Sequence, residues 1–351
     1  MEVSFLTLRL KKLFPLAISR GTTAEHNNLF VFVRRGEHVG IGECAPRTGF
    51  ADTMAPLAQA DLERLVASDL EGLSIHGVHA RAREMELDPF ALCALDIALW
   101  DLRAKEANMP LYRLLGLSNR STPTSVTIGI EPEEIVRERV PIILDLTGAK
   151  ALKIKLGSPQ GMEHDQQIYS TAAEVARPYG VSLRVDANGG WDVARARSTM
   201  AWLAERGCDY VEQPLEKGNE AELPAIFEGR PLPIYLDESI WSSADIPPVV
   251  HCIDGVNLKL TKCGGITEAL RIVATARAHG LGTMIGCMSD SSVGIAAGAA
   301  LGELFDHIDL DSHLNLNPDP ATGAPIIDGV VTPTEQPGHG AALKPEFLPA
   351  P

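Results

Sequence analysis

Eight short β-rich runs follow one another along residues 125–310, separated by amphipathic segments of about a dozen residues. The runs are Ser125–Ile130, Ala151–Leu156, Ser182–Val185, Tyr210–Val211, Ile234–Leu236, Gly255–Leu258, Gly282–Gly286 and Ile308–Leu310. Strands that alternate with helices form a parallel sheet, and eight such units predict a closed (β/α)8 barrel of the TIM type. The fold class is therefore α/β. A chain of 351 residues also has room for one smaller domain.

A different pattern precedes these runs. Residues 3–45 read as strands, with a hairpin at Arg35-Gly36-Glu37. Residues 88–115 then show helical periodicity, with Asp88 as N-cap and Pro89 in the first turn. The tail is rich in proline and glycine. We therefore expect an N-terminal α+β domain over residues 1–120, the barrel over 121–314, and a C-terminal strap over 315–351 that packs on the first domain.

Charged residues lie within or at the ends of the β-rich runs that are expected to form the barrel. Parallel strands are covered on both faces, so a charge there is costly unless it is paired or bound to metal. The run at 151–157 contains Lys153 and Lys155, and the next three runs end in Asp186, Glu212 and Asp237. Three oxygen ligands on consecutive strands suit Mg²⁺. The alternatives are solvated surface lysines and ordinary helix caps.

The lysines suggest proton transfer. Lys153 and Lys155 project to the same side because strand side chains alternate. Repulsion and desolvation there favour the neutral amine, so we expect a lysine pKa lowered toward that of a general base. Lys259 ends the sixth run and would face Lys155 across the barrel mouth; Lys262 is the other candidate. A carboxylate held between two lysines permits 1,1-proton transfer at the adjacent carbon.

The eighth run adds two carboxylates, Asp309 and Asp311, which the same alternation places on one side. They would form an anionic receptor for a substrate ammonium group and would repel an anionic aromatic or lactone substrate. The alternative is a solvated loop.

Composition excludes several other functions. The net charge of −15 argues against nucleic acid and anionic membrane partners. The six cysteines show no C-x-x-C spacing, as expected of reduced thiols in a cytoplasmic protein. The start of the chain does not read as a signal peptide, and no segment approaches the roughly 20 apolar residues of a membrane helix. The oligomeric state, including a homo-oligomer, is left open.

Several motifs along the chain resemble the enolase superfamily in its muconate-lactonising subgroup, and most of all the L-Ala-D/L-Glu epimerases and related dipeptide epimerases. They are Ile41–Cys44, Ala94–Asp101, Lys153-x-Lys155, Asp186–Asn188, Glu212–Pro214, Asp237–Ser239 and Asn257–Lys259. The mandelate racemase branch is less similar because its base is a histidine after the seventh strand. This chain has Gly286-Cys-Met-Ser289 there.

The resemblance implies roles for these residues. Lys155 and Lys259 would be the acid/base catalysts, Lys153 would contact the bound carboxylate, and the three acids would hold Mg²⁺. Asp309 and Asp311 would bind the α-ammonium group of a dipeptide, with Thr127 beside them. Arg20, in a capping-domain loop, would receive an acidic substrate side chain.

The implied function is a Mg²⁺-dependent dipeptide epimerase that inverts the α-carbon of the C-terminal residue, with Ala-Glu favoured. The alternative is a lyase or cycloisomerase such as o-succinylbenzoate synthase or muconate cycloisomerase. One departure concerns specificity: Met288-Ser289-Asp290 stands where many relatives carry Met-Leu-Glu. The physiological dipeptide and the direction of use stay open.

Overall fold

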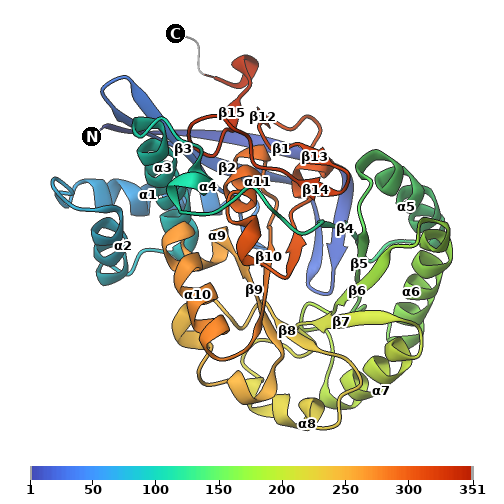
Figure 1. Cartoon of the computed structure of the whole chain (residues 1–351). Helices are drawn as coiled ribbons and strands as arrows, with labels where there is room; N and C mark the ends of the chain where they lie inside the picture. Colours follow the sequence, from blue (N-terminus) through green and yellow to red (C-terminus); the bar gives the residue numbers. More distant parts are fainter. Residues whose placement is uncertain (1, 349–351) are drawn as a thin grey trace.

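A three-stranded antiparallel sheet forms the first part of the computed structural model, which describes residues 2–348 (Figure 1). Its strands, in order across the sheet, are β1 (Glu2–Ile18), β2 (Gly21–Arg35) and β3 (His38–Cys44). The expected hairpin at Gly36 is confirmed, with a φ of 59° that glycine adopts without a steric cost. Four helices follow: α1 (Met54–Val66), α2 (Ile75–Glu84), α3 (Pro89–Glu106) and α4 (Leu111–Leu114).

Helix α3 packs unusually close to β3. A Cβ atom at Gly42 would lie 2.0 Å from the Ala94 carbonyl oxygen, and one at Gly40 equally close to that of Ala98. These two glycines therefore permit the contact. Asp88 caps the helix by accepting a hydrogen bond from the Phe90 N–H, as the sequence predicts. The predicted helical stretch ends earlier than residue 115, at Glu106, and a short second helix follows Pro110.

Eight parallel strands form the barrel, and all eight predicted runs are confirmed as strands. They are β4 (Ser125–Ile128), β5 (Ala151–Lys155), β6 (Ser182–Asp186), β7 (Cys208–Glu212), β8 (Ile234–Leu236), β9 (Gly255–Lys259), β10 (Gly282–Gly286) and β11 (His307–Asp309). Each strand pairs with its sequence neighbour, and a parallel bridge between Thr124 and Ile308 joins the first strand to the last. The sheet is thereby closed.

Helices surround most of the barrel (Figure 1). They are α5 (Glu133–Thr147), α6 (Met162–Ala176), α7 (Val193–Ala204), α8 (Leu223–Phe227), α9 (Leu260–Cys263), α10 (Ile266–Ala278) and α11 (Ser292–Ala299). The expected helix between β8 and β9 is wrong: this segment has only the 3₁₀ turns η3 (Ser243–Asp245) and η4 (Val250–Cys252). Pro247 and Pro248 lie between the two turns and prevent a continuous helix. A 3₁₀ turn, η6 (Ser312–Asn315), follows β11.

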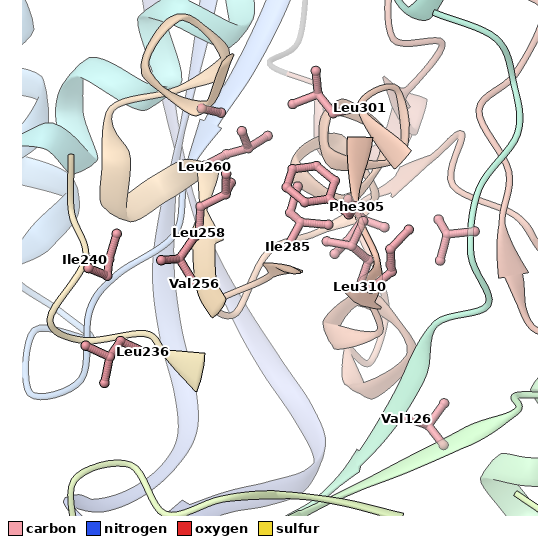
Figure 2. Packing of buried hydrophobic residues seen from close by; sticks show 14 of the residues in the cluster. Val126, Leu236, Ile240, Val256, Leu258, Leu260, Ile285, Leu301, Phe305 and Leu310 are labelled. Atoms are coloured by element: carbon pink, nitrogen blue, oxygen red, sulfur yellow. The ribbon is translucent and has the colours of Figure 1, made fainter. Parts of the chain in front are cut away.

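Alternation along the strands separates two layers. Figure 2 shows outward side chains such as Val256, Leu258 and Ile285, which are buried between strands and helices. At the N-terminal end of the barrel, inward positions are occupied by Tyr210, Tyr235 and Met284, with Arg184 and His307 packed against the two tyrosine rings. The carboxylates and lysines named above lie at inward positions toward the opposite, C-terminal end. The barrel thus has a largely aromatic floor beneath a charged mouth.

The C-terminal tail returns to the first domain. Its short strands pair as β12 (Ala321–Thr322) with β15 (Ala342–Leu343) and as β13 (Ile326–Ile327) with β14 (Val330–Val331). Gly338 exchanges backbone hydrogen bonds with Met109 and Leu111, and the buried His339 donates its N–H to Asp101. The domain boundaries at residues 120 and 314 stay a prediction. No helix within residues 2–348 is long and apolar enough to cross a membrane.

Candidate active site

Three carboxylates meet at the barrel mouth. Asp186 and Glu212 end the adjacent strands β6 and β7 and pair in register, and Asp237 directly follows β8. Their ligand oxygens all lie within 4.8 Å of one another, and all three residues are buried. Asn188, two residues after Asp186, has a positive φ of 44°, and Gln213, directly after Glu212, has a positive φ of 38°. Such backbone strain is typical of functional sites.

The electrostatics of these carboxylates are unequal. Burial and the negative charge of Asp186 raise the pKa of Glu212 to about 7. Burial also opposes ionisation of Asp186, but the ammonium groups of Lys155 and Lys153 outweigh it and lower its pKa to about 2. Glu212 is therefore the carboxylate whose charge is least compensated by the protein.

The residues present fit a divalent cation. Glu212 Oε2 lies 2.8 Å from Lys153 Nζ, yet within residues 2–348 it has no partner in hydrogen-bonding geometry. Three buried carboxylate oxygens from consecutive strands are the donor set that Mg²⁺ prefers. A bound cation would supply the positive charge that Glu212 lacks.

Each lysine predicted from the sequence contacts a carboxylate of this group. Lys155 Nζ lies 2.5 Å from Asp186 Oδ2, and Lys259 Nζ lies 2.8 Å from Asp237 Oδ2. Lys153 lies deeper, 2.7 Å from Asp309 Oδ2. Strands β5 and β9 are four places apart in an eight-stranded barrel, so Lys155 and Lys259 approach the carboxylates from opposite sides.

The expected lowering of a lysine pKa, drawn for the interior pair Lys153 and Lys155, is wrong for Lys153, and the pKa of Lys259 is raised as well. Burial does lower the pKa of each ammonium group, but the adjacent carboxylates outweigh it and raise it above the ordinary value. The residues considered in the sequence argument were the lysines alone. The carboxylates contributed by the neighbouring strands reverse the sign.

Other residues of the site are less apparent from the sequence. Lys262 Nζ, considered as the alternative to Lys259, lies 2.6 Å from Asp237 Oδ1, so both lysines contact the same carboxylate. Asn257 donates to Glu212 Oε1 at 2.7 Å, and the Asn188 N–H donates to Asp186 Oδ1 at 2.8 Å. Inward alternation on β9 could have indicated Asn257, which lies two residues before Lys259.

Asp309 and Asp311 lie together beside β4. Thr127 donates its backbone N–H to Asp311 Oδ2 at 2.6 Å, and its hydroxyl lies 3.3 Å from Asp309 Oδ1. Burial opposes ionisation of Asp309, but Lys153 and Lys155 lower its pKa, whereas burial and the charge of Asp309 raise the pKa of Asp311 to about 6. This pair is an anionic site that an added cation would stabilise.

The Arg20 guanidinium is already paired with a carboxylate of the protein. Its guanidinium lies 2.6 Å from Glu238 Oε1 and donates to the Asn188 carbonyl oxygen at 3.0 Å. It does line the site, but its charge is compensated by Glu238 before any substrate binds.

Two cavities adjoin these residues. The larger, of about 570 Å³, extends from Lys155, Lys259 and Asp237 toward Arg20 and the capping domain. The smaller, of about 130 Å³, extends from Lys155 past Asp309 and Asp311 to apolar residues of β1 and α5. The residues that line both cavities are Lys12, Leu16, Lys155, Cys287 and Met288.

The loop after β10 is held by the capping domain. The buried Glu43 of β3 accepts hydrogen bonds from Asn28 Nδ2, the N–H and hydroxyl of Ser291, and the N–H of Gly294. Asp290 lines neither of these two cavities; it accepts from the Met288 N–H at 2.8 Å and from the Thr261 hydroxyl at 3.2 Å. Asp290 therefore braces this loop.

A closed parallel barrel with three carboxylates on consecutive strand ends, flanked by lysines and covered by an antiparallel domain, defines an enolase-type barrel protein. Residues 136–347 match the family described as enolase C-terminal domain-like, and residues 1–116 match the N-terminal domain of mandelate racemase and muconate lactonizing enzyme. The chain belongs to this family of the enolase superfamily.

Individual relatives are similar over nearly the whole chain. A protein of Flavobacteria bacterium (strain MS024-2A) named hydrophobic dipeptide epimerase is 56% identical over 99% of both chains. One of the same name from Roseobacter litoralis is 55% identical, over 98% of this chain and 99% of that one. The crystal structure of a dipeptide epimerase from Enterococcus faecalis V583, complexed with Mg and L-Leu-L-Tyr, is 28% identical, with a TM-score of 0.88 over 97% of this chain and 99% of that one.

Proposed function

We propose that the protein is a Mg²⁺-dependent dipeptide epimerase that inverts the α-carbon of the C-terminal residue. The observation that carries the proposal is the placement of Lys155 and Lys259 on opposite sides of one carboxylate group. A proton can be removed by one lysine and returned by the other only if both reach the same carbon from opposite faces. The names of the relatives from Flavobacteria bacterium and Roseobacter litoralis support this reaction.

The carboxylate group would hold the metal and, through it, the substrate carboxylate. Asp186, Glu212 and Asp237 are proposed as the ligands. A bound Mg²⁺ supplies positive charge that stabilises the enediolate formed when the α-proton leaves. Lys153, buried beside Glu212, would add a second positive charge to the same side of the substrate carboxylate.

Proton transfer itself would use Lys155 and Lys259. One lysine must be neutral to accept the α-proton while the other is an ammonium group that donates to the opposite face. In the structure Lys155 contacts Asp186 and Lys259 contacts Asp237. When these carboxylates ligate a cation their charge is shared, so the ammonium form of each lysine is less favoured and a base becomes available.

The remaining polar residues fit a dipeptide. Asp309 and Asp311 would receive its α-ammonium group, with Thr127 orienting Asp311. Glu238 already neutralises Arg20, and the relatives at 56% and 55% identity are named hydrophobic dipeptide epimerases, so we propose dipeptides with hydrophobic residues rather than Ala-Glu. The apolar lining of the smaller cavity, including Phe14, Ile143 and Leu146, supports a hydrophobic N-terminal residue.

The alternative lyase or cycloisomerase reaction is less compatible with this site. Its substrates carry no ammonium group and would place anionic or aromatic parts beside Asp309 and Asp311. We further propose a cytoplasmic location, which the six free cysteines support.

Mass spectrometry of a dipeptide library in D₂O, with and without EDTA, tests the proposal. We expect Mg²⁺-dependent uptake of one deuterium, greatest for dipeptides of hydrophobic residues. Turnover of an o-succinylbenzoate precursor or of muconate, with no exchange in any dipeptide, would refute it.

A further inference from the structure

Lys12 of β1 reaches from the capping domain to the boundary between the two cavities. Its ammonium donates to the Ser289 hydroxyl at 2.7 Å, its one hydrogen-bond partner among residues 2–348, and no carboxylate there lies within 4.0 Å. By contrast, Lys155, Lys259 and Lys262 each form an ion pair. An ammonium group has three donors, so two hydrogens of Lys12 are left for a ligand.

The peptide bond of a bound dipeptide would lie at this boundary between the two cavities. If the C-terminal α-carbon lies between Lys155 and Lys259 and the α-ammonium lies at Asp309 and Asp311, the peptide carbonyl passes between the cavities. Of the residues that line both, only Lys12 and Lys155 have strong side-chain donors, and Lys155 is already assigned to transfer of the α-proton. The Met288 N–H is engaged by Asp290.

We propose that the Lys12 ammonium donates a charge-assisted hydrogen bond to the peptide carbonyl oxygen of the substrate. Every dipeptide carries this oxygen. This inference rests on the proposed function. The Ser289 hydroxyl fixes the position of the Lys12 ammonium, and the Ser289 carbonyl oxygen accepts a hydrogen bond from Asn28 Nδ2 at 2.9 Å. Burial lowers the pKa of Lys12 to about 8, which is consistent with a group enclosed by the site.

The test compares L-Ala-L-Phe with its thioamide analogue, in which sulfur, a weaker acceptor, replaces the peptide oxygen. Wild type, Lys12→Met and Lys12→Arg are assayed for α-proton exchange with Mg²⁺. Lys11→Met is the matched control, because Lys11 is exposed and pairs with Glu25. Circular dichroism verifies that each variant is folded.

We expect Lys12→Met to lower kcat/KM for L-Ala-L-Phe by about 10- to 100-fold, the usual loss of a charge-assisted hydrogen bond. The loss for the thioamide should be smaller, so that the preference of wild type for the oxygen substrate declines in the variant. Lys12→Arg should retain part of this preference, and Lys11→Met all of it.

Equal losses for the two substrates in Lys12→Met, or unchanged kinetics, would overturn the assignment of Lys12. Absence of exchange in wild type with any dipeptide would instead refute the proposed function, so the two failures are distinguishable.

Discussion

Replacing Glu212 by glutamine should stabilise the metal-free protein at alkaline pH and abolish its response to Mg²⁺. Burial and the charge of Asp186 raise the pKa of Glu212 from 4.5 to about 7. Because the folded state then binds the proton more tightly than the unfolded state, wild type loses stability as the pH rises from about 4.5 to about 7, and the loss persists above that range. At about 1.4 kcal/mol per pKa unit, this loss is about 3.5 kcal/mol.

Glutamine also fits the surrounding hydrogen bonds. If the glutamine oxygen faces Lys153 and the Asn257 amide turns by 180°, the glutamine NH₂ group donates to Asn257 Oδ1, because Asn257 Nδ2 occupies that position beside Glu212 Oε1 in wild type. In wild type, Asn257 Oδ1 has no partner among the described residues. The substitution therefore removes a buried charge without leaving a new unpaired amide, which would otherwise offset the gain.

The assay is thermal denaturation of EDTA-treated protein at pH 5 and pH 8.5, each with and without added Mg²⁺. Near pH 5 the two proteins should melt at similar temperatures, and at pH 8.5 Glu212→Gln should melt roughly 3–6 °C higher. Saturating Mg²⁺ should stabilise wild type, by about 2.7 kcal/mol at 100 times its Kd, and leave the variant unchanged. Glu222→Gln, which removes an exposed carboxylate, is the control. A metal-free variant less stable than wild type at pH 8.5 would refute the reasoning.

Three further predictions concern other parts of the molecule. Lys155→Ala and Lys259→Ala should each slow epimerisation about 10²–10⁴-fold. Each variant should still exchange the α-proton of one epimer, because the remaining lysine reaches one face of the α-carbon. Exchange of both epimers, followed by NMR in D₂O, would contradict this. Asp309→Asn should lower kcat/KM for dipeptides about 10- to 100-fold more than kcat/KM for N-acetyl amino acids, which carry no ammonium group; steady-state kinetics can compare the two losses. Glu43→Ala should lower the free energy of unfolding by about 3–5 kcal/mol because buried donors of Ser291 and Gly294 lose their acceptor; urea denaturation showing a loss below about 1 kcal/mol would argue against it.

The barrel and its charged mouth could be predicted because their signals are local. A charged residue at the end of an apolar run, such as Asp186 or Lys259, is anomalous within a window of a few residues. Strand alternation then decides which side chains face inward. The resulting contacts among Lys155, Asp186 and Asp237 follow from strand order alone.

The features that sequence reasoning missed depend on distant partners. Lys12 gains its significance from Ser289, and Glu43 from Ser291, and no local pattern connects these pairs. The direction of the Lys153 pKa shift was predicted wrongly for a related reason, because the neighbouring carboxylates come from other strands. The absence of a helix after β8, in contrast, was indicated locally by Pro247 and Pro248, which disfavour a helix. The prediction of eight regular βα units did not take these prolines into account.

The packing of α3 has a consequence for synthesis of the chain. This helix is buried on nearly all sides, against β3, against α9 and α10, and beside His339 of the tail. The sheet partner is made before α3, but the barrel helices and the tail follow much later, in residues 260–341. At about 5–20 residues per second, a ribosome needs tens of seconds to deliver them. During that interval the nascent capping domain exposes the face of α3 that the barrel and the tail later cover, and we expect it to be prone to aggregation until they arrive.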